Sequence, residues 1–335
     1  MIIGLIILIS ILLCVAGYTL FTQRYIYIHH TSLMSSSADE IFSELNQLEY
    51  WPSWLPWTLF DDDASVLVNQ RSNLSLEGAL VQLKGPLLGK VSCHIESLQA
   101  SKRLTFQVQT DRFYPSPIHV LIELSETEDH QVVMNVIAKS ELNFWHRYKQ
   151  TQLLKQIHAD MRLMLIRLCA RLQSDNVYAT SFERQNSRTL ANVDAITRPF
   201  LVSDHSMSMQ MEQGFRDLII SLGPDNRPAG PSFALFEAAD LSQHYFTGKL
   251  GIPIQNLSPC EAKPERITFK GNYAGLRYQG SYQHLWLAWH VLKTNLRLHN
   301  QKQAKQRCSI EVYEVSPKET SDELQFVTVL YMPIQ

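Results

Sequence analysis

The residue types that most often bind metals are dispersed along this chain. The five cysteines are odd in number, contain no CxxC pair and lie at positions 14, 93, 169, 260 and 308, so the sequence predicts neither a disulfide framework nor a zinc site. His29 and His30 are adjacent and would point to opposite faces of a strand, where they cannot easily share one ion. The acidic triplet at 61–63 has no accompanying ligands and is predicted to be a solvated turn. We therefore expect no metal and no cofactor.

Motifs of the common enzyme classes are also missing from the sequence. It contains no Gly-rich phosphate loop, no HExxH and no GxSxG, which disfavours a cofactor-dependent enzyme. The formal net charge is −2, and the basic cluster of Lys302, Lys305 and Arg307 is too short for a phosphate-binding stripe. We therefore expect no nucleic acid among the partners.

The first residues form an uncharged apolar segment. Residues 2–21, IIGLIILISILLCVAGYTLF, span about 30 Å at about 1.5 Å per residue, the thickness of a hydrocarbon core. The alternative is a cleaved signal peptide, but the basic n-region and small-residue cleavage site of such a peptide are not evident. We expect a single-pass anchor in the cell inner (cytoplasmic) membrane. Arg24, after the segment, weakly favours a body on the cytoplasmic side.

Roughly 310 residues follow the anchor, enough for two domains that each bury a core. A polar stretch rich in Ser, Arg, Asn and Gln begins near Tyr178 and has no clean period, so it is predicted to be a linker. The predicted organisation is an anchor over 1–23, a first domain over 24–177, a linker over 178–190 and a second domain over 191–335. The sequence does not indicate the oligomeric state.

The first domain is predicted to begin with a strand, a short helix and a Trp-rich elbow. An extended stretch over 26–34 precedes a helix over 38–48, whose apolar face is formed by Ile41, Phe42 and Leu45. YWPSWLPW, at 50–57, contains two prolines that oppose a regular helix and three tryptophans with large apolar faces. We expect the tryptophans to close the core more than to touch a ligand.

Alternating segments follow between residues 80 and 142. The clearest are LTFQVQT, at 104–110, and VVMNVIA, at 132–138, with turn-forming stretches between them, which favours an antiparallel meander. A helix over 144–172 is predicted to cover one face, with an apolar stripe formed by Leu154, Ile157, Met161, Met164, Leu168 and Leu172.

This order, with ADEIFSELNQLEYWPSWLPW as its local signature, resembles the SRPBCC or START-like (polyketide cyclase-like) helix-grip family over about 26–175. The resemblance implies an antiparallel sheet gripping a long C-terminal helix, with a hydrophobic cavity for a lipid-like or aromatic ligand. The fold class is therefore expected to be α+β.

The second domain shows two βαββ units. DAITRPFLV, MSMQMEQGFRDLIISLG, SFALF and HYFTGKLGIPI form the first unit, in which Gly223 ends a helix whose inward residues are Met211, Phe215, Leu218 and Ile219. ITFKGNYAGLRYQG, SYQHLWLAWHVLKTNLRLHN, CSIEVYEV and LQFVTVLYMPI repeat the order. This duplication resembles the GyrI-like family, the effector-binding domain of AraC- and MerR-type regulators, over about 190–335. The motifs GPSFALFEAAD, YQGSYQHLWLAWHVL and IEVYEVSP carry the resemblance, although Val315 and Ser316 stand where relatives tend to have Asp before Pro317.

The GyrI-like resemblance implies a cleft for hydrophobic, often cationic small molecules. It places Glu311 in that cleft, with candidate aromatic walls at Tyr278, Tyr282, Trp286 and Tyr313. A buried carboxylate among aromatic rings selects cations, because burial is costly without one. An exposed strand position for Glu311 and a core position for Trp286 or Trp289 remain alternatives.

These resemblances predict a membrane-anchored, non-enzymatic binding protein for hydrophobic or cationic small molecules, a sensor or a sequestering module. The alternative is a small-molecule hydrolase or cyclase, with Glu311 as general base and Tyr282 or Tyr313 as proton donor. A scaffold without a ligand is a third possibility and predicts a filled cleft.

Overall fold

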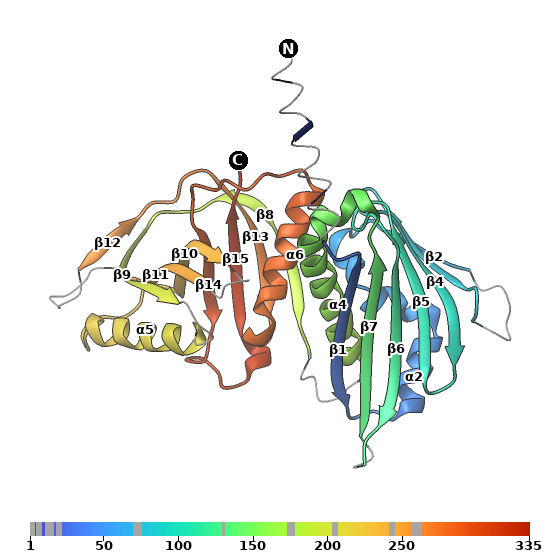
Figure 1. The fold of residues 1–335 in the computed structure, drawn as a ribbon. Coiled ribbons are helices and arrows are strands. Elements are labelled where there is room, and N and C mark those ends of the chain that lie inside the picture. Colours follow the sequence, from blue (N-terminus) through green and yellow to red (C-terminus); the bar gives the residue numbers. More distant parts are fainter. Residues whose placement is uncertain are drawn as a thin grey trace. The chain divides into compact units, whose positions relative to one another are not determined.

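The computed structural model describes residues 4, 9–10, 17, 22–69, 76–128, 131–172, 178–202, 207–240, 245–255 and 263–335. They form two compact units, 1–179 and 180–335, each an antiparallel sheet with helices (Figure 1). The predicted anchor over 2–21 lies almost entirely outside the described residues, so it stays a prediction. Within the described ranges, no helix has the length and apolar character needed to cross a membrane.

The first unit begins with β1 (Tyr25–Met34) and α2 (Ala38–Asn46), as predicted. Ser37 starts α2 through a capping box: its side chain accepts from the amide of Glu40, whose carboxylate accepts from the amide of Ser37. The buried face of α2 is formed by the predicted residues, Ile41, Phe42 and Leu45.

The seven strands of the first sheet lie in the order β1-β7-β6-β5-β4-β3-β2, so consecutive strands from β2 to β7 are neighbours. The predicted meander is confirmed. The sequence did not predict β2, whose side chains are mostly exposed. After β1 the strands are β2 (Ser65–Asn69), β3 (Leu80–Gly85), β4 (Gly89–Gln99), β5 (Arg103–Thr110), β6 (Ile118–Glu126) and β7 (Val132–Glu141).

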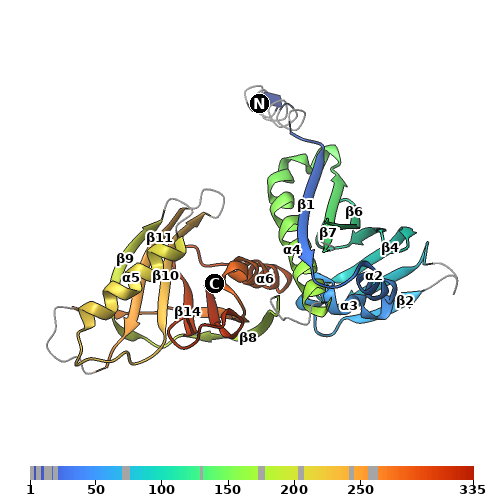
Figure 2. The same cartoon turned by 90° about the horizontal axis from the view of Figure 1, so that it is seen from below.

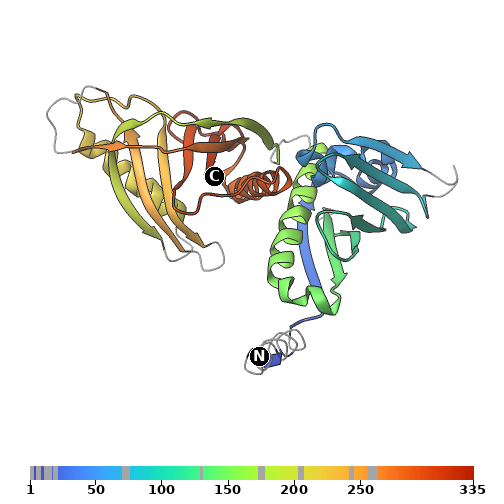
Figure 3. The same cartoon turned by 90° about the horizontal axis from the view of Figure 1, so that it is seen from above.

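The long helix α4 (Gln150–Leu172) packs against β1, as Figure 3 shows from above. The 3-10 segment η3 (Phe144–Lys149) precedes it, so the predicted helical region begins with a tighter turn. Four residues of the predicted stripe are buried and two, Leu154 and Leu172, are half-buried. A strand, short helices, a meander and a covering helix are therefore all present in the expected order.

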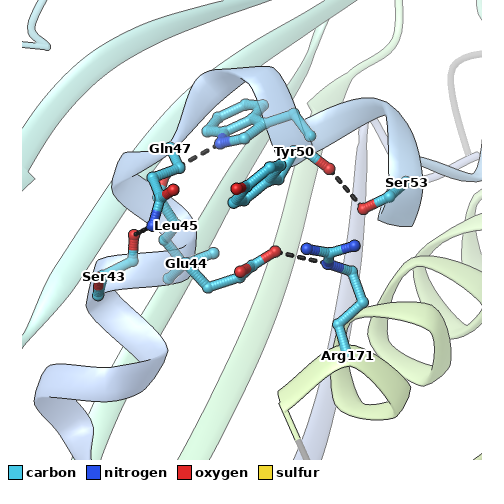
Figure 4. A network of polar contacts seen from close by, with 8 residues as sticks. Ser43, Glu44, Leu45, Gln47, Tyr50, Ser53 and Arg171 are labelled. Carbon is cyan, nitrogen blue, oxygen red and sulfur yellow. Dashed lines mark hydrogen bonds and ion pairs between the residues drawn. The ribbon is translucent and has the colours of Figure 1, made fainter.

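The Trp-rich elbow consists of η1 (Leu48–Tyr50), α3 (Trp51–Trp54) and η2 (Pro56–Phe60). Its three tryptophans are fully buried, and the indole of Trp51 donates to the carbonyl of Leu45 over 2.9 Å. Arg171, near the end of α4, pairs with Glu44 at 2.5 Å and stacks 4.9 Å from the ring of Tyr50 (Figure 4). Arg171 thus joins α4 to α2 through Glu44 and to the elbow through Tyr50, and Trp51 joins the elbow to α2.

The acidic triplet differs from the prediction at its first residue. Asp61 is buried, and its carboxylate accepts from the amides of Leu87 and Leu88 over 2.7 and 3.0 Å. Asp61 thereby satisfies two backbone amides in the turn between β3 and β4. The first of these amides is 26 residues away, so the sequence of the triplet does not indicate this contact.

The second sheet has the strand order β12-β9-β11-β10-β14-β15-β13-β8. Two units, β9-α5-β10-β11 and β13-α6-β14-β15, meet at the β10–β14 pair, and each has its third strand between its first and second. The helix α5 packs against β9 and β11, as Figure 2 shows. The elements are β8 (Ser181–Thr189), β9 (Val193–Val202), α5 (Met207–Leu222), β10 (Ser232–Asp240), β11 (Tyr245–Pro253), β12 (Pro264–Ile267), β13 (Asn272–Gln279), η4 (Tyr282–His284), α6 (Leu285–Leu298), β14 (Ser309–Val315), η5 (Glu323–Gln325) and β15 (Val327–Pro333).

Two further details correct the sequence-based expectations. Most of the predicted linker, 178–190, is β8, an edge strand paired with β13; its side chains are mostly exposed, so it lacks the apolar alternation that marks a half-buried strand. On α5, Leu218 is buried but Ile219 is 39% exposed, because the apolar stripe turns away from it. Gly223 ends the helix with φ 77°, as predicted.

Candidate functional site

Glu311 lies in the middle of the second sheet. It is on β14, directly opposite Ala234 of β10 and Leu330 of β15. Directly paired residues of antiparallel strands point to the same face, and Ala234 belongs to the apolar cluster under α5. Glu311 therefore points to the helix-covered face, where it is only 4% exposed. The exposed-strand alternative for Glu311 is wrong.

Both carboxylate oxygens of Glu311 accept a hydrogen bond from an uncharged donor. The indole N–H of Trp289, on α6, donates to Oε1 over 2.7 Å, and the hydroxyl of Tyr313 donates to Oε2 over 2.6 Å. Two neutral donors satisfy part of the hydrogen-bonding capacity of a carboxylate but do not neutralise its charge.

Burial raises the pKa of Glu311, while the hydrogen bonds from Tyr313 and Trp289 oppose this rise. Across the described ranges, no Lys, Arg or His side chain forms an ion pair with this carboxylate. The site is therefore electrostatically incomplete when Glu311 is ionised: a positive charge placed beside it would stabilise the carboxylate form.

Aromatic rings from three elements surround this carboxylate. The ring of Tyr313 lies 5.7 Å from Phe215 of α5 and 6.0 Å from Tyr282 of η4, both edge to face. Tyr282 also packs 4.9 Å from Phe326. Burial, with a further contribution from Glu311, raises the pKa values of Tyr313 and Tyr282. Both phenols therefore stay protonated near neutral pH, and a neutral phenol ring can stabilise a cation that lies over its face.

The structure brings together three of the five predicted site residues, Glu311, Tyr313 and Tyr282. Trp286 is half-buried on α6. Tyr278 is fully buried on β13, which β15 separates from β14; its hydroxyl donates to the carbonyl of Ser281 over 2.7 Å and its ring packs on Phe182. Tyr278 thus has a structural environment, and its role in binding stays a prediction.

The sequence analysis missed Trp289 as a contact of Glu311. Tyr282 and Trp289 are seven residues apart. In the single helix predicted for this stretch, that spacing would place both side chains on one face. That spacing was the available signal, and it distinguishes Trp289 from Trp286.

A surface depression is lined in part by Tyr313. Its volume is about 440 Å³, within the range of small-molecule sites. It lies beside the loop that follows β14 and is lined by Pro228, Gly230, Pro231, Ser232, Tyr313, Glu314, Ser316, Lys318 and Glu319. Tyr313 is the lining residue that also donates to Glu311, and Glu311 itself does not line the depression.

The first unit contains a second buried carboxylate that the sequence analysis did not single out. Asp160 of α4 is fully buried and accepts a hydrogen bond from the hydroxyl of Tyr114, whose ring packs 6.3 Å from Trp57. Within the described ranges, no three His, Cys, Asp or Glu side chains are grouped as metal ligands would be.

Comparison with known proteins gives matches among solved structures only. No family model matches the chain, and no curated protein matches it significantly. The C-terminal domain of EcmrR is 11% identical with a TM-score of 0.38, covering 47% of this chain and 97% of that domain. A START superfamily protein from Mycobacterium smegmatis is 12% identical with a TM-score of 0.34, covering 44% and 97%. CalU16 from Micromonospora echinospora is 16% identical with a TM-score of 0.31, covering 45% and 77%. At these scores the matches establish no function.

Proposed function

We propose that this chain is a membrane-anchored binding protein for hydrophobic or cationic small molecules, acting as a sensor or a sequestering module. The observation that carries the proposal is Glu311, a buried carboxylate held by two neutral donors and surrounded by aromatic rings. The proposed location is the inner membrane, with residues 2–21 as the anchor and both units on the cytoplasmic side.

The preference for cations follows from the cost of burying charge. An ionised carboxylate removed from water is unfavourable unless a counter-charge or further hydrogen bonds compensate it. A ligand cation would supply that charge, and the rings of Tyr313 and Tyr282 would stabilise it by roughly 0.5–2 kcal/mol per favourable contact. The apolar part of the ligand would lie in the adjacent depression, beside Pro231 and Pro228.

Calorimetric titration with a quaternary aryl-ammonium compound and its isosteric tert-butyl analogue tests this proposal. Because the two ligands differ only in charge, the ratio of their affinities isolates the carboxylate's contribution. We expect Glu311→Gln to weaken binding of the cation about 10- to 150-fold, corresponding to the roughly 1.5–3 kcal/mol of a charged contact, and to change binding of the neutral analogue little.

Glu311→Gln also suits this test structurally. Glutamine keeps the side-chain volume; its amide oxygen can accept from Trp289, and its amide nitrogen can donate to the oxygen of Tyr313. The matched control is Glu212→Gln, at a side chain 72% exposed on α5, which should bind as the wild type does. Equal cation affinity in the wild type and Glu311→Gln would refute the site.

The raised pKa of Glu311 favours one second candidate, a small-molecule hydrolase or cyclase. A desolvated carboxylate with a raised pKa is a stronger general base than an exposed one, and Tyr313 or Tyr282 would be the proton donor. Turnover of an activated ester that disappears in Glu311→Gln would support this candidate. Saturable binding without product would support the binding protein instead.

The proposed topology has its own test. A reporter fused after Gln335 should be active only in the cytoplasm, and protease added outside the inner membrane should leave both units intact. A C-terminus exposed to external protease would reverse the orientation without affecting the ligand site.

A further inference from the structure

The end of the first sheet where β1 begins and β7 ends directly follows residues 2–21 in the chain and carries exposed aromatic and basic side chains. In the register of β1 and β7, Tyr25 lies opposite Glu141. The amide of Leu142 donates to the carbonyl of Arg24 over 2.8 Å, and Nε of Arg147 donates to the carbonyl of Leu142 over 3.4 Å. The segment η3 is thereby fastened to Arg24, three positions after the end of residues 2–21. In Figure 1 this is the upper end of β1 and α4.

Large aromatic side chains are exposed at this end. Trp145 is 78% exposed, Tyr25 58%, Tyr27 54% and Tyr148 53%. Basic side chains accompany them: Lys139 lies 5.5 Å from the ring centre of Tyr27, and Lys149 lies 5.3 Å from that of Tyr148. We call this surface the aromatic–basic patch; its members are Arg24, Tyr25, Tyr27, Lys139, Phe144, Trp145, Arg147, Tyr148 and Lys149.

The composition of the aromatic–basic patch matches the chemistry of a bilayer interface. Tryptophan and tyrosine concentrate at the headgroup level, where the ring meets apolar surface and the N–H or O–H meets water. Arginine and lysine reach from the same depth toward phosphate groups. The four cations of the patch outnumber the neighbouring carboxylate of Glu141, which pairs with Arg24, so a net positive charge faces outward.

We infer that the aromatic–basic patch docks on the interface of a bilayer that contains anionic phospholipid, with Trp145 inserted at headgroup depth. The inference rests on the proposed anchoring by residues 2–21, because a chain anchored three positions before Arg24 holds the patch close to the lipid surface. A juxtamembrane cation adds about 1 kcal/mol of attraction to an anionic surface. Docking would fix the orientation of the first unit on the membrane, which a tether alone does not.

Fluorescence quenching in nanodiscs tests docking with the full chain. Lipids brominated in the upper acyl chain quench only tryptophans at the interface. Trp51, Trp54 and Trp57 are fully buried in the protein, and Trp145 is the member of the patch that reports contact. We expect brominated phosphatidylcholine–phosphatidylglycerol discs to quench the wild type measurably more than Trp145→Phe, which keeps an aromatic ring but removes the fluorophore.

Charge reversal tests the electrostatic part. Lys149→Glu should reduce the quenching of Trp145 in discs containing phosphatidylglycerol and should matter less in discs of phosphatidylcholine alone. The matched control is Lys102→Glu, another exposed lysine, in the turn between β4 and β5 at the opposite end of the sheet. It should be quenched as the wild type is.

The possible failures are distinguishable. A protein that does not co-elute with the discs overturns the anchor, and the docking with it. A disc-associated protein whose Trp145 is not quenched overturns the docking alone and leaves the patch for a protein partner. Equal quenching of Lys149→Glu and the wild type in anionic discs overturns the role assigned to anionic lipid. None of these results bears on cation binding at Glu311, which the calorimetry measures separately.

Discussion

Acidification should destabilise the first unit through a histidine pair between β1 and α4. His30 lies 4.6 Å, ring centre to ring centre, from His158, and its Nε2 lies 3.2 Å from the backbone carbonyl of His158. Burial, followed by the charge of His158, lowers the pKa of His30 from 6.5 to about 4. Burial and Arg162 also lower the pKa of His158. Protonation of either histidine would thus place a second positive charge near Arg162, between β1 and α4.

The sign and size of the effect follow from proton linkage. Between about pH 6.5 and pH 4, His30 is protonated in the unfolded chain but neutral in the folded protein. The free energy of unfolding therefore falls as the pH falls. Above this window both states are neutral at His30, and below it both are protonated, so no further change arises there. From pH 7.5 to pH 5 the loss would be about 2 kcal/mol for a fully buried ring. Because the His30 ring is only half-buried, solvent screening reduces this to about 1 kcal/mol.

Urea unfolding of the full chain in detergent, followed by tryptophan emission at several pH values, measures this loss. His30→Gln removes the titrating ring but keeps a side chain that can hydrogen-bond the carbonyl of His158, so it should lose about 1 kcal/mol less than the wild type between these pH values. The control is His29→Gln: His29 lies on the opposite face of β1, 2.9 Å from the amide oxygen of Asn135, and it contributes least among the groups that lower the pKa of His30, so its variant should follow the wild type closely. A pH dependence that is identical in His30→Gln and the wild type would refute this reasoning.

Three further predictions concern single contacts. Arg171→Ala removes a half-buried ion pair to Glu44 and a stacked ring, and should lower the free energy of unfolding by about 1 kcal/mol, measured by urea unfolding. Gly223→Ala places a side chain at φ 77° and should cost about 1 kcal/mol in the same assay. Trp289→Phe removes the donor to Oε1 of Glu311, so the pKa of Glu311 should rise further, measured by NMR titration of its carboxyl carbon.

Each of these three predictions would be contradicted by a specific result. Arg216→Ala, which breaks a pair whose side chains are 61% and 72% exposed, is the control for Arg171; equal stability of the two variants would contradict the attachment of the elbow to α4. A stabilising Gly223→Ala would contradict the helix end. An unchanged or lowered Glu311 pKa in Trp289→Phe would contradict the hydrogen bond.

Local periodicity was sufficient to predict most helices and strands. The three-and-four spacing of Ile157, Met161, Met164 and Leu168 predicted α4, and the alternation in LTFQVQT predicted β5, because one buried face per element imposes those periods. The repeated βαββ order predicted β9, β10, β11, β13, β14 and β15 of the second sheet but not β8 or β12, and the observed strand order shows that the two repeats meet at the β10–β14 pair.

Features that depend on distant partners were not predictable in this way. Asp61 is buried because of amides 26 residues later, and β8 is a strand because of its pairing with β13. For Glu311, alternation gives only two choices, inward or outward. The pairing with Ala234 and the hydrogen bond from Trp289 decide between them, and neither is encoded near Glu311 in the sequence.

The titration of Glu311 itself is the most direct measurement of the proposed cation site. Protein labelled at the glutamate carboxyl carbons can be followed by NMR across pH, with Glu311→Gln identifying the signal. We predict a pKa above the ordinary 4.5 in the free protein and a fall in that pKa when a quaternary aryl-ammonium compound saturates the site, because the cation stabilises the carboxylate. A Glu311 pKa that is ordinary in the free protein, or that does not move on saturation, would contradict the account.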